Sequence, residues 1–539
     1  MGDYTQLVLA CLAAGIATYA LRWYTDPLRA IPTVGGSSLP GLSWLAAFRM
    51  LGDYRDILEE GYRKARLART PPGGRQYPDG AGKVPALDQW MVVVSGREMI
   101  LQSKYIFDAA VLADEYHAEV VKEKLTRKLP ALLPDVIDEV TVAIKDHVVT
   151  REDVHGGIEE WTSVDVIPAM QKIIARVSSR AFVGLPLCRN EEYLSLAVDF
   201  AVDFMKTVVV LRLFPTFLKP IVALFYNLVK RDTARAVPFL RPIIEERQRA
   251  SAELGEDWND KPNDLLQFLL DKATAKNDTV FAIAQRLLTL NFAAIHTSSN
   301  TITHALTRLA EDPELVGPLR DEIEQSIAAD GWTGAALANM WQLDSLLRET
   351  LRFHGIGLCE HLPLLLPPSL SPFLLPSRPP SPAHTCPLLM GRKAMKDLTL
   401  RDGTHIPRGA IVQVAAYATH HDSAVLDGGR ADAFDAFRYA RMRSGSQATT
   451  TTSQDGGARH QFTSTSPEYV AFGHGAHACP GRYFASNELK AMLAYIVLNY
   501  DLRLGGDGVR APDVFAALAA LPAPTTRVLF RPRKRAVSI

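Results

Sequence analysis

The amino-acid sequence predicts a mainly α protein with a smaller β part, preceded by one N-terminal transmembrane helix. Apolar residues recur at helical spacing over long stretches, most clearly in 287–299 and 484–496. Short strand-like segments, such as 89–95 and 526–531, lie between them. An apolar run over 7–21 stands apart from both patterns. We therefore expect an anchor (residues 1–24), a hinge (25–52) and one large domain (53–539).

The composition limits the class of partner and the compartment. The chain has 539 residues, an apolar fraction of 47% and a net formal charge of zero. That length is ample for a large core, and the neutral balance argues against nucleic acid as the main partner. The five cysteines are Cys11, Cys188, Cys359, Cys386 and Cys479. Their spacing matches neither a zinc site nor a disulfide framework, and an odd number fits a reducing compartment.

The N-terminal run is interpreted as a membrane anchor. Leu7 to Leu21 is almost uninterruptedly apolar, Arg22 closes it, and Trp23 and Tyr24 are candidate interfacial residues. A bilayer span needs about 17–25 residues, which the stretch from position 4 to 24 supplies. A cleaved signal peptide is the alternative, but no basic leader and no clear cleavage site are present. The prolines and glycines of 25–52 predict a stiff linker behind the anchor.

Two features of the first half have open interpretations. His117 and Lys122 lie on a helix-like segment, where a solvated charged face is the simplest explanation. Phe200 to Leu228 is strongly apolar and is broken by Pro215 and Pro220. It reads either as an exposed apolar loop that contacts a membrane or partner, or as ordinary core.

A long helix over 287–299 is apolar until it reaches His296 and Thr297. Thr297, Ser298 and Ser299 can donate hydrogen bonds to the preceding carbonyl groups and bend the helix. The bend would leave room for a small molecule beside the helix. A plain polar kink in a core helix is the alternative.

Three charged residues form a candidate cluster. Glu349 and Arg352 lie one helical turn apart, and Arg438 follows in a later aromatic segment. A buried carboxylate needs paired donors, and two arginines that clamp one glutamate would supply them. We expect this cluster to serve the fold and to have no chemical role.

The stretch from Leu358 to Met390 (358–390) fits neither a helix nor a strand. Prolines recur every few residues, so neither a regular helix nor a central strand can form. It is nevertheless too rich in leucine for a solvated linker. We interpret it as an anomalous insertion, such as a retained intron translated in frame.

The most informative stretch is Phe472-Gly-His-Gly-Ala-His-Ala-Cys-Pro-Gly481. Its glycines permit backbone conformations that a Cβ would hinder, and Pro480 suits the first position of the apolar helix that follows. Cys479 is thus expected at a helix N-terminus, where the dipole favours a thiolate. A buried free cysteine is the plain alternative.

The pattern Phe472-x-x-Gly475-x-x-x-Cys479-x-Gly481 resembles the haem-binding loop of cytochromes P450 of the fungal, microsomal type. The resemblance implies a cytochrome P450 fold and haem b (iron protoporphyrin IX) as cofactor, with Cys479 as the axial iron ligand. It also places Phe472, Gly475, His477 and Gly481 around the haem.

The same resemblance assigns roles to residues elsewhere. Thr297 takes the oxygen-activating position on the long helix, and His296 stands where the family usually has an acid, so an imidazole would move protons there. The Ala-Ala-Ile-His-Thr variant resembles ent-kaurene-oxidase-like members that oxidise terpenoids or steroids. Glu349, Arg352 and Arg438 match the family's structural triad, with Ala431 in place of the usual proline. A basic residue such as His117 or Lys122 would bind a haem propionate.

The expected function is a haem-thiolate monooxygenase of secondary metabolism. It would insert one oxygen atom of O2 into a terpenoid, steroid or polycyclic xenobiotic, with NADPH electrons from a separate NADPH–cytochrome P450 reductase. The resemblance implies a single-pass protein of the endoplasmic reticulum membrane with a cytosolic catalytic domain. The alternatives are a P450-fold isomerase or dehydratase that needs no external electrons, and a haem protein inactivated by the insertion at 358–390.

Overall fold

The computed structural model describes residues 105–148, 161–212, 218–355, 390–400, 404–423, 430–449, 458–516 and 519–533, two strands near position 90, and a few isolated residues. The chain divides into two compact units. The smaller comprises 1–102, 362–426 and 515–519, and the larger comprises 103–361, 427–514 and 520–539. Most of the expected anchor and hinge, and nearly all of 358–390, lie outside the described residues. Within the described residues, no helix has the length and hydropathy of a membrane span.

The predicted class, mainly α with a smaller β part, is confirmed. The helices of the larger unit are α3 (Ala109–Ala113), α4 (Tyr116–Val120), α5 (Thr126–Val148), α6 (Val166–Phe182), α7 (Glu191–Arg212), α8 (Lys219–Phe225), α9 (Leu228–Leu254), α10 (Leu265–Lys276), α11 (Val280–Glu311), α12 (Val316–Asp330), α13 (Gly334–Asn339), α14 (Trp341–His354), α17 (Arg438–Thr449) and α18 (Arg482–Asn499). A π-helical turn, Val121–Leu125, joins α4 to α5.

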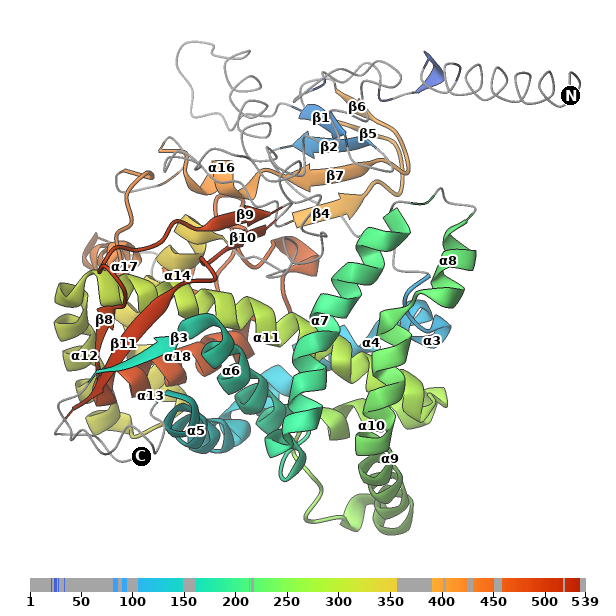
Figure 1. Cartoon of the computed structure of the whole chain (residues 1–539), viewed down its shortest axis with the longest axis horizontal. Coiled ribbons are helices and arrows are strands. Elements are labelled where there is room, and N and C mark those ends of the chain that lie inside the picture. The colour runs from blue at the N-terminus through green and yellow to red at the C-terminus, as the bar shows by residue number, and fades with distance from the viewer. Residues whose placement is uncertain are drawn as a thin grey trace, which may run out of the picture. The chain divides into compact units, whose positions relative to one another are not determined.

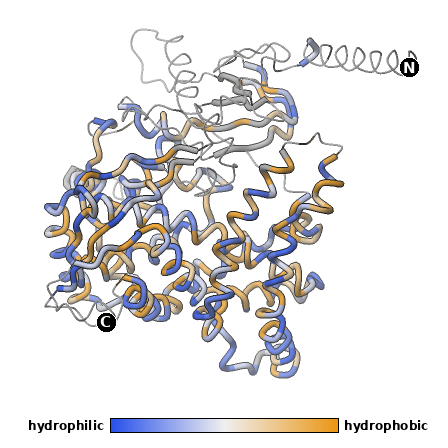
Figure 2. Tube along the Cα trace, in the orientation of Figure 1, coloured by the Kyte–Doolittle hydropathy of each residue, from blue (hydrophilic) through white to orange (hydrophobic). Residues whose placement is uncertain are grey.

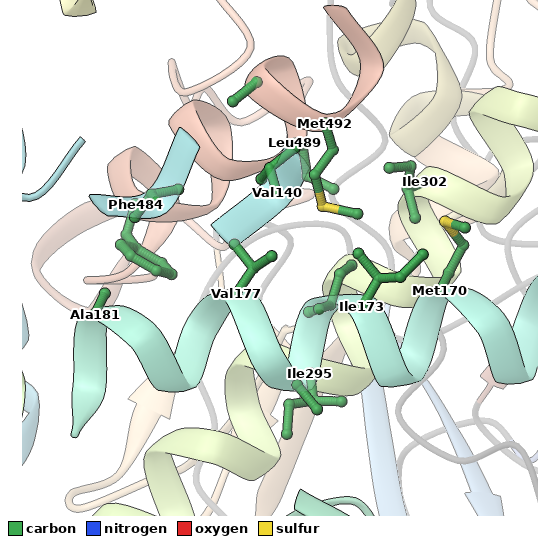
Figure 3. Close-up of a cluster of buried hydrophobic side chains, with 14 of the residues drawn as sticks. Val140, Met170, Ile173, Val177, Ala181, Ile295, Ile302, Phe484, Leu489 and Met492 are labelled. Carbon is green, nitrogen blue, oxygen red and sulfur yellow. The ribbon is translucent and has the colours of Figure 1, made fainter. Parts of the chain in front are cut away.

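Helix α11 is the central element of the larger unit (Figure 1). It begins after Thr279, whose hydroxyl group accepts a hydrogen bond from the backbone N–H of Ala282 and so caps the helix. Along its length α11 packs against α6, α7, α9, α14 and α18. Figure 3 shows the core between three of these helices, where Ile295 and Ile302 of α11 lie near Val177 of α6 and Met492 of α18. This packing fixes the position of the middle of α11, which carries the candidate site.

The β structure is split between the units. In the smaller unit a four-stranded sheet has the order β1 (Ala81–Pro85), β2 (Trp90–Val94), β7 (Ile411–Val414), β4 (Met390–Lys393), and only the β2–β7 pair is parallel. The turn-rich sequence of 400–409 predicts a hairpin, and β5 (Leu398–Thr399) pairs with β6 (His405–Ile406) there, followed by β7 and α16 (Ala416–His420). In the larger unit β3 (Thr162–Asp165), β11 (Arg527–Pro532) and β8 (Tyr500–Leu504) form an antiparallel sheet. β9 (Val514–Ala516) pairs with β10 (Ala519–Leu521).

The structure refines three local expectations. The apolar stretch 200–228 is mostly helical, and its exposed apolar part is α8, which has Pro220 in its first turn (Figure 2). The low-complexity polar run from Ser444 to Gln454 predicts a flexible loop, but α17 continues into it as far as Thr449. Pro480 does not begin the last helix, since α18 starts at Arg482 and Gly481 occupies the preceding position.

Candidate active site

The loop before α18 holds Cys479 in a tight turn. Gly473 and Gly475 have φ angles of 67° and 78°, in the left-handed region that glycine adopts without strain, as the sequence predicted. The backbone N–H of Cys479 donates to the carbonyl oxygen of Phe472 at 2.7 Å, which closes the loop on itself. The guanidinium group of Arg482 donates to the carbonyl oxygen of Cys479 at 2.8 Å. The thiol is thus fixed from both sides of the chain.

The sulfur atom of Cys479 lies where backbone donors converge. The backbone N–H groups of Gly481 and Arg482 both hydrogen-bond to it and lower its pKa, but burial has the larger effect and raises the pKa of the thiol above its ordinary value. Cys479 lies three residues before the first residue of α18, and the N–H groups at the start of this helix favour the thiolate as expected, but the opposing effect of burial is larger. Coordination to a metal cation removes the proton from such a thiol.

The surroundings of the sulfur are close-packed. A methyl group on Gly481 would lie 4.0 Å from the sulfur atom of Cys479 and 3.9 Å from Val121 in the π-helical turn. That turn therefore packs beside the cysteine loop. Phe472 is buried against Phe462, with ring centroids 5.1 Å apart, whereas Gly475 and His477 are exposed.

One face of α11 is open in the middle of a buried helix. Residues 282–288 and 298–307 are buried, but Leu290, Ala294 and Thr297 are partly exposed and Ala293 is exposed. These positions follow the i, i+3, i+4, i+7 spacing of one helix face. The hydroxyl group of Thr297 donates to the carbonyl oxygen of Ala293 at 2.8 Å, the back-bonding that the sequence predicted. The result is an apolar stripe with a single hydroxyl group, which suits a surface that faces a cofactor and an apolar substrate.

His296 points elsewhere. Its ring is 2% exposed, and its Nε2 atom lies 3.1 Å from the carbonyl oxygen of Val198 on α7. Successive helical residues are separated by about 100° around the axis, so His296 and Thr297 serve different neighbours. The structure thus gives His296 a contact between α7 and α11 and does not bring it onto the open stripe with Thr297.

His117 is held by a residue that the sequence reasoning missed, Arg286. This arginine stacks on Tyr116, with the guanidinium carbon 4.0 Å from the ring centroid, and donates to Asp278 at 2.9 Å. Its third contact is to Nδ1 of His117 at 3.2 Å. Because an arginine can only donate, Nδ1 accepts and Nε2 carries the proton. Burial, and then the charge of Arg286, lower the pKa of His117 to about 4, so its ring is neutral.

Lys122 differs from His117 in its surroundings. It is exposed on the π-helical turn and forms no ion pair with another described residue. Because Val121 of the same turn packs beside the cysteine loop, Lys122 lies near the edge of the site.

The three charged residues of the expected triad are brought together. Nε and Nη2 of Arg352 donate to the fully buried carboxylate of Glu349 at 2.7 Å, and Nε of Arg438 approaches the same group at 3.4 Å. Arg352 also donates to the carbonyl oxygen of Ala431 at 2.9 Å. The backbone contact shows why a residue other than proline suffices at that position. This cluster ties α14 to the start of α17.

A second tie, also missed from the sequence, joins α14 to the segment before the cysteine loop. Arg348 lies over the ring of Tyr469, with its guanidinium carbon 3.8 Å from the centroid, and donates to the carbonyl oxygen of Ser464 at 2.9 Å. No sequence motif predicts this role, because it depends on how segment 461–469 packs against α14 in the folded protein.

A cysteine sulfur that receives backbone N–H bonds, in a protein whose longest described helix has an open apolar stripe with one hydroxyl group, fits the chemistry of haem-thiolate oxygenases. The comparisons identify the family. The family model "Cytochrome P450" matches residues 121–361 and 383–530, and the chain belongs to this family. It is 48% identical to the cytochrome P450 monooxygenase CYP512U6 of Ganoderma lucidum, over 99% of this chain and 97% of the relative.

Two further comparisons are more distant. The ent-kaurene oxidase P450-4 of Gibberella fujikuroi is 28% identical over 98% of both chains. The structure of retinoic acid-bound cyanobacterial CYP120A1 superposes with a TM-score of 0.58 and 18% identity, covering 94% of this chain and all of that one, and shows the shared fold. The protein is therefore a cytochrome P450 monooxygenase, an oxidoreductase whose cofactor is haem b bound through a cysteine thiolate.

The residues of the site fit that cofactor. A thiolate ligand needs an accessible sulfur, and Cys479 is partly exposed and forms no disulfide. Its N–H partners compensate part of the negative charge that an iron-bound sulfur retains. An apolar macrocycle needs an apolar wall, which the stripe of α11 provides. The propionates need donors, and the Nε2–H of His117 could serve as one if the haem lies beside α4.

Proposed function

We propose that this cytochrome P450 oxidises a lipophilic substrate, a di- or triterpenoid, a steroid or a polycyclic xenobiotic, as part of secondary metabolism. One atom of O2 enters a C–H bond of the substrate, and the other leaves as water with two protons and the two electrons of NADPH. A separate NADPH–cytochrome P450 reductase passes on the electrons. The apolar stripe of α11, with Thr297 as its hydroxyl group, is the observation that carries the proposal. The distant relationship to an ent-kaurene oxidase supports the terpenoid choice.

We assign roles to the site residues on this basis. Haem b, when bound, supplies the iron that activates O2. The sulfur atom of Cys479 would hold the haem iron, on the loop from Phe472 to Gly481 that also contains Gly475 and His477. The hydroxyl group of Thr297 would donate a hydrogen bond to O2 beside the haem and pass on a proton. His117 donates from Nε2 to a haem propionate, and Lys122 adds a positive charge nearby.

His296 is assigned differently from the sequence-based hypothesis. The hydrogen bond of its ring to Val198 supports a role in the packing of α7 on α11 over a role in proton transfer. Glu349, Arg352 and Arg438 maintain the fold around the haem.

A membrane location completes the proposal. Residues 1–24 would form a single-pass anchor in the endoplasmic reticulum, residues 25–52 the hinge, and the catalytic domain would face the cytosol. Helix α8 supports contact with a bilayer, because Ile221, Leu224 and Phe225 are 56%, 80% and 84% exposed in a helix of only seven residues. Flotation of the full chain with phospholipid vesicles, with and without residues 1–24, tests the anchor.

Oxidation itself is tested with a carbonyl difference spectrum of the reduced protein, followed by a screen of terpenoids, steroids and polycyclic compounds. With a microsomal reductase, NADPH and isotopically labelled O2, we expect one labelled atom in the product. A product formed without NADPH would support the isomerase or dehydratase alternative, which no comparison favours. A protein that binds haem but yields no product with any tested class would support the inactive alternative.

A further inference from the structure

Arg286 lies at the N-terminal end of the open stripe of α11. It precedes Leu290 by about one turn and Thr297 by about three, so the three residues occupy one face of the helix. Unlike the stripe, Arg286 is fully buried. Its Nε atom donates to the carboxylate of Asp278 at 2.9 Å, and its Nη2 atom donates to the carbonyl oxygen of Ala110 at 2.9 Å. The stripe therefore ends in a cation whose position is fixed.

The remaining nitrogen of Arg286, Nη1, contacts two acceptors near the start of α4. It donates to the carbonyl oxygen of Asp114 at 2.6 Å and lies 3.2 Å from Nδ1 of His117. Tyr116 stacks under the guanidinium group, and its hydroxyl group donates to Asp278 at 2.9 Å. Because Nη1 only donates, a proton on Nδ1 of His117 would point at another donor. The contact therefore excludes one of the two neutral forms of the ring.

The helix that carries His117 also reaches the cysteine loop. The backbone N–H of Val121 donates to the carbonyl oxygen of His117, so the two side chains lie on one face, one turn apart. Val121 packs beside Gly481, two residues after Cys479. This face therefore meets α11 at Arg286 and the cysteine loop at Gly481, as a side wall of the candidate site would. His117 is half-buried, and its Nε2 atom has no hydrogen-bond partner among the described residues.

We propose that Arg286 is a positioning residue for the haem: its Nη1 atom keeps Nδ1 of His117 unprotonated, so that Nε2 carries the hydrogen atom that a haem propionate accepts. Arg286 is not a catalytic residue, because its polar atoms contact only groups of the protein. The inference rests on the proposed contact of His117 with a propionate. It goes beyond that contact, because it explains why a histidine that can hold its proton on either nitrogen presents a donor.

The charges around His117 agree with this assignment. Burial, and then the charge of Arg286, lower the pKa of the ring to about 4, and Asp114 opposes the shift. The nearby carboxylates are each paired with a cation: Asp114 with Lys276, Glu119 with Lys272 and Asp278 with Arg286. His117 is therefore neutral at physiological pH, and which nitrogen holds its proton depends on Arg286.

The test measures how fast the full-length, haem-loaded protein loses haem to an excess of apomyoglobin, at about pH 8 and at about pH 6. In Arg286→Met the carbonyl oxygen of Asp114 loses its donor, and a proton on Nδ1 of His117 can replace it. Nε2 then turns a lone pair to the propionate, so haem loss at the higher pH should be at least several-fold faster than in the wild type.

The lower pH gives the distinguishing result. Without the neighbouring cation the pKa of His117 rises, so the ring of Arg286→Met gains a second proton and donates from Nε2 again. Haem loss from this variant should therefore slow at about pH 6. The wild type should show no such recovery, because its ring is neutral at both pH values. The double variant Arg286→Met with His117→Gln should not recover either, since it lacks the titrating ring.

Two variants of His117 test the orientation of the ring without a change at Arg286. Glutamine places its amide nitrogen near the position of Nε2, whereas asparagine places it near that of Nδ1. His117→Gln should keep most of the haem, and His117→Asn should lose it at least several-fold faster than the wild type. Arg320→Met is the matched control. This half-buried arginine of α12 donates to the carbonyl oxygen of Val497 at 3.0 Å, and its loss should lower the melting temperature and leave haem loss unchanged.

Specific outcomes overturn the inference. If Arg286→Met loses haem at the wild-type rate, or faster by the same factor at both pH values, Arg286 serves the fold alone. Where Arg286→Met does not fold, faster loss from His117→Gln than from His117→Asn overturns the inference, because the donor then lies at Nδ1. The proposed role of His117 fails on a different result, in which both of its variants retain haem as the wild type does. A carbonyl difference spectrum of each variant verifies that the thiolate ligand is intact.

Discussion

His354 and Asp513 share a 2.7 Å hydrogen bond at the end of α14, although they lie 159 positions apart in the sequence. On the other side of the imidazole ring, Nε of Arg308 lies 3.2 Å from Nε2. Because arginine only donates, Nε2 accepts and the Nδ1 proton goes to Asp513. His304 stacks on the same ring with a centroid distance of 4.1 Å. The hydrogen bonds from Arg308 through His354 to Asp513, together with the stacked ring of His304, hold α11 against α14.

This cluster makes the stability of the protein depend on pH. Burial lowers the pKa of His304 to about 4 and holds that of His354 well below its usual value, although Asp513 opposes the shift and Arg308 and Arg510 add to it. The unfolded chain binds these protons near pH 6.5, so stability is complete above that pH and falls toward pH 4. For His304 alone the loss is about 3 kcal/mol.

The measurement is the melting temperature between pH 7.5 and 4.5. His304→Leu removes one titrating ring and should flatten the profile, even if it lowers the value at pH 7.5. An unchanged slope would assign the acid sensitivity to other groups. The pKa of Asp513 is lowered, so its contribution persists above about pH 4 and does not account for this window.

Replacement of Cys479 tests the ligand assignment. We expect Cys479→Ser to abolish the thiolate-type carbonyl spectrum and monooxygenation, because a hydroxyl group does not replace the thiolate charge at the iron. The fold should survive, since the loop is closed by the backbone N–H of Cys479, which serine retains. Cys188→Ser, a change at a buried cysteine in the turn Leu187–Arg189 that follows α6, is the control and should keep the spectrum. Persistence of the spectrum in Cys479→Ser would require another ligand.

Thr297 and His296 should give opposite results. Thr297→Ala is expected to raise several-fold the share of NADPH electrons released as peroxide, whereas Thr297→Ser keeps the hydroxyl group and should stay coupled. His296→Asn retains a donor for the carbonyl group of Val198 and should leave coupling unchanged. A loss of product with a steeper pH dependence in His296→Asn would return His296 to the proton-transfer role that the sequence suggested.

Removal of the buried carboxylate should be the most damaging single change. Glu349→Ala leaves Arg352 and Arg438 buried without their anion, at a cost of about 3–5 kcal/mol. We expect low haem content and little folded protein. Arg430→Ala is the comparison, because its ion pair with Asp432 is solvent-exposed and should contribute little. Equal yields from both variants would show that the triad is dispensable.

The sequence predicted the structure best where the local pattern alone determines the conformation or contact of a residue. Glycines at positive φ, the i, i+3 pair of Glu349 and Arg352, and the apolar period of α11 all predicted the observed structure. It failed where long-range packing decides the outcome. Arg286 and Arg348 look like surface cations until the fold brings Tyr116 and Tyr469 under them. The partner of His296 on α7 and the burial of Glu488 are equally invisible in local patterns.

The anomalous segment 358–390 yields the sharpest prediction. The family model matches 121–361 and 383–530, so 362–382 is the stretch inside the matched range that it leaves out. The structure adds a second limit. β4 begins at Met390, which pairs with Val414 of β7, so a deletion of all of 358–390 would remove a residue of the ladder. A deletion of 362–382 keeps β4 and removes most of the prolines.

We expect the 362–382 deletion to raise the haem-loaded fraction of purified protein and to leave its carbonyl spectrum unchanged. Shortening a loop costs little and gains about 0.6 kcal/mol of closure entropy for each halving of its length, and removal of a leucine-rich run lowers the tendency to aggregate. The longer deletion, with Gly357 joined to Gly391, should perform less well because of Met390. Transcript sequencing tests the origin of the segment independently. If the segment comes from a retained intron, we expect a spliced transcript that lacks it. If the shorter deletion destroys haem binding while the spliced message is absent, the segment is native. It would then have to provide, between α14 and β4, a connection on which the site depends.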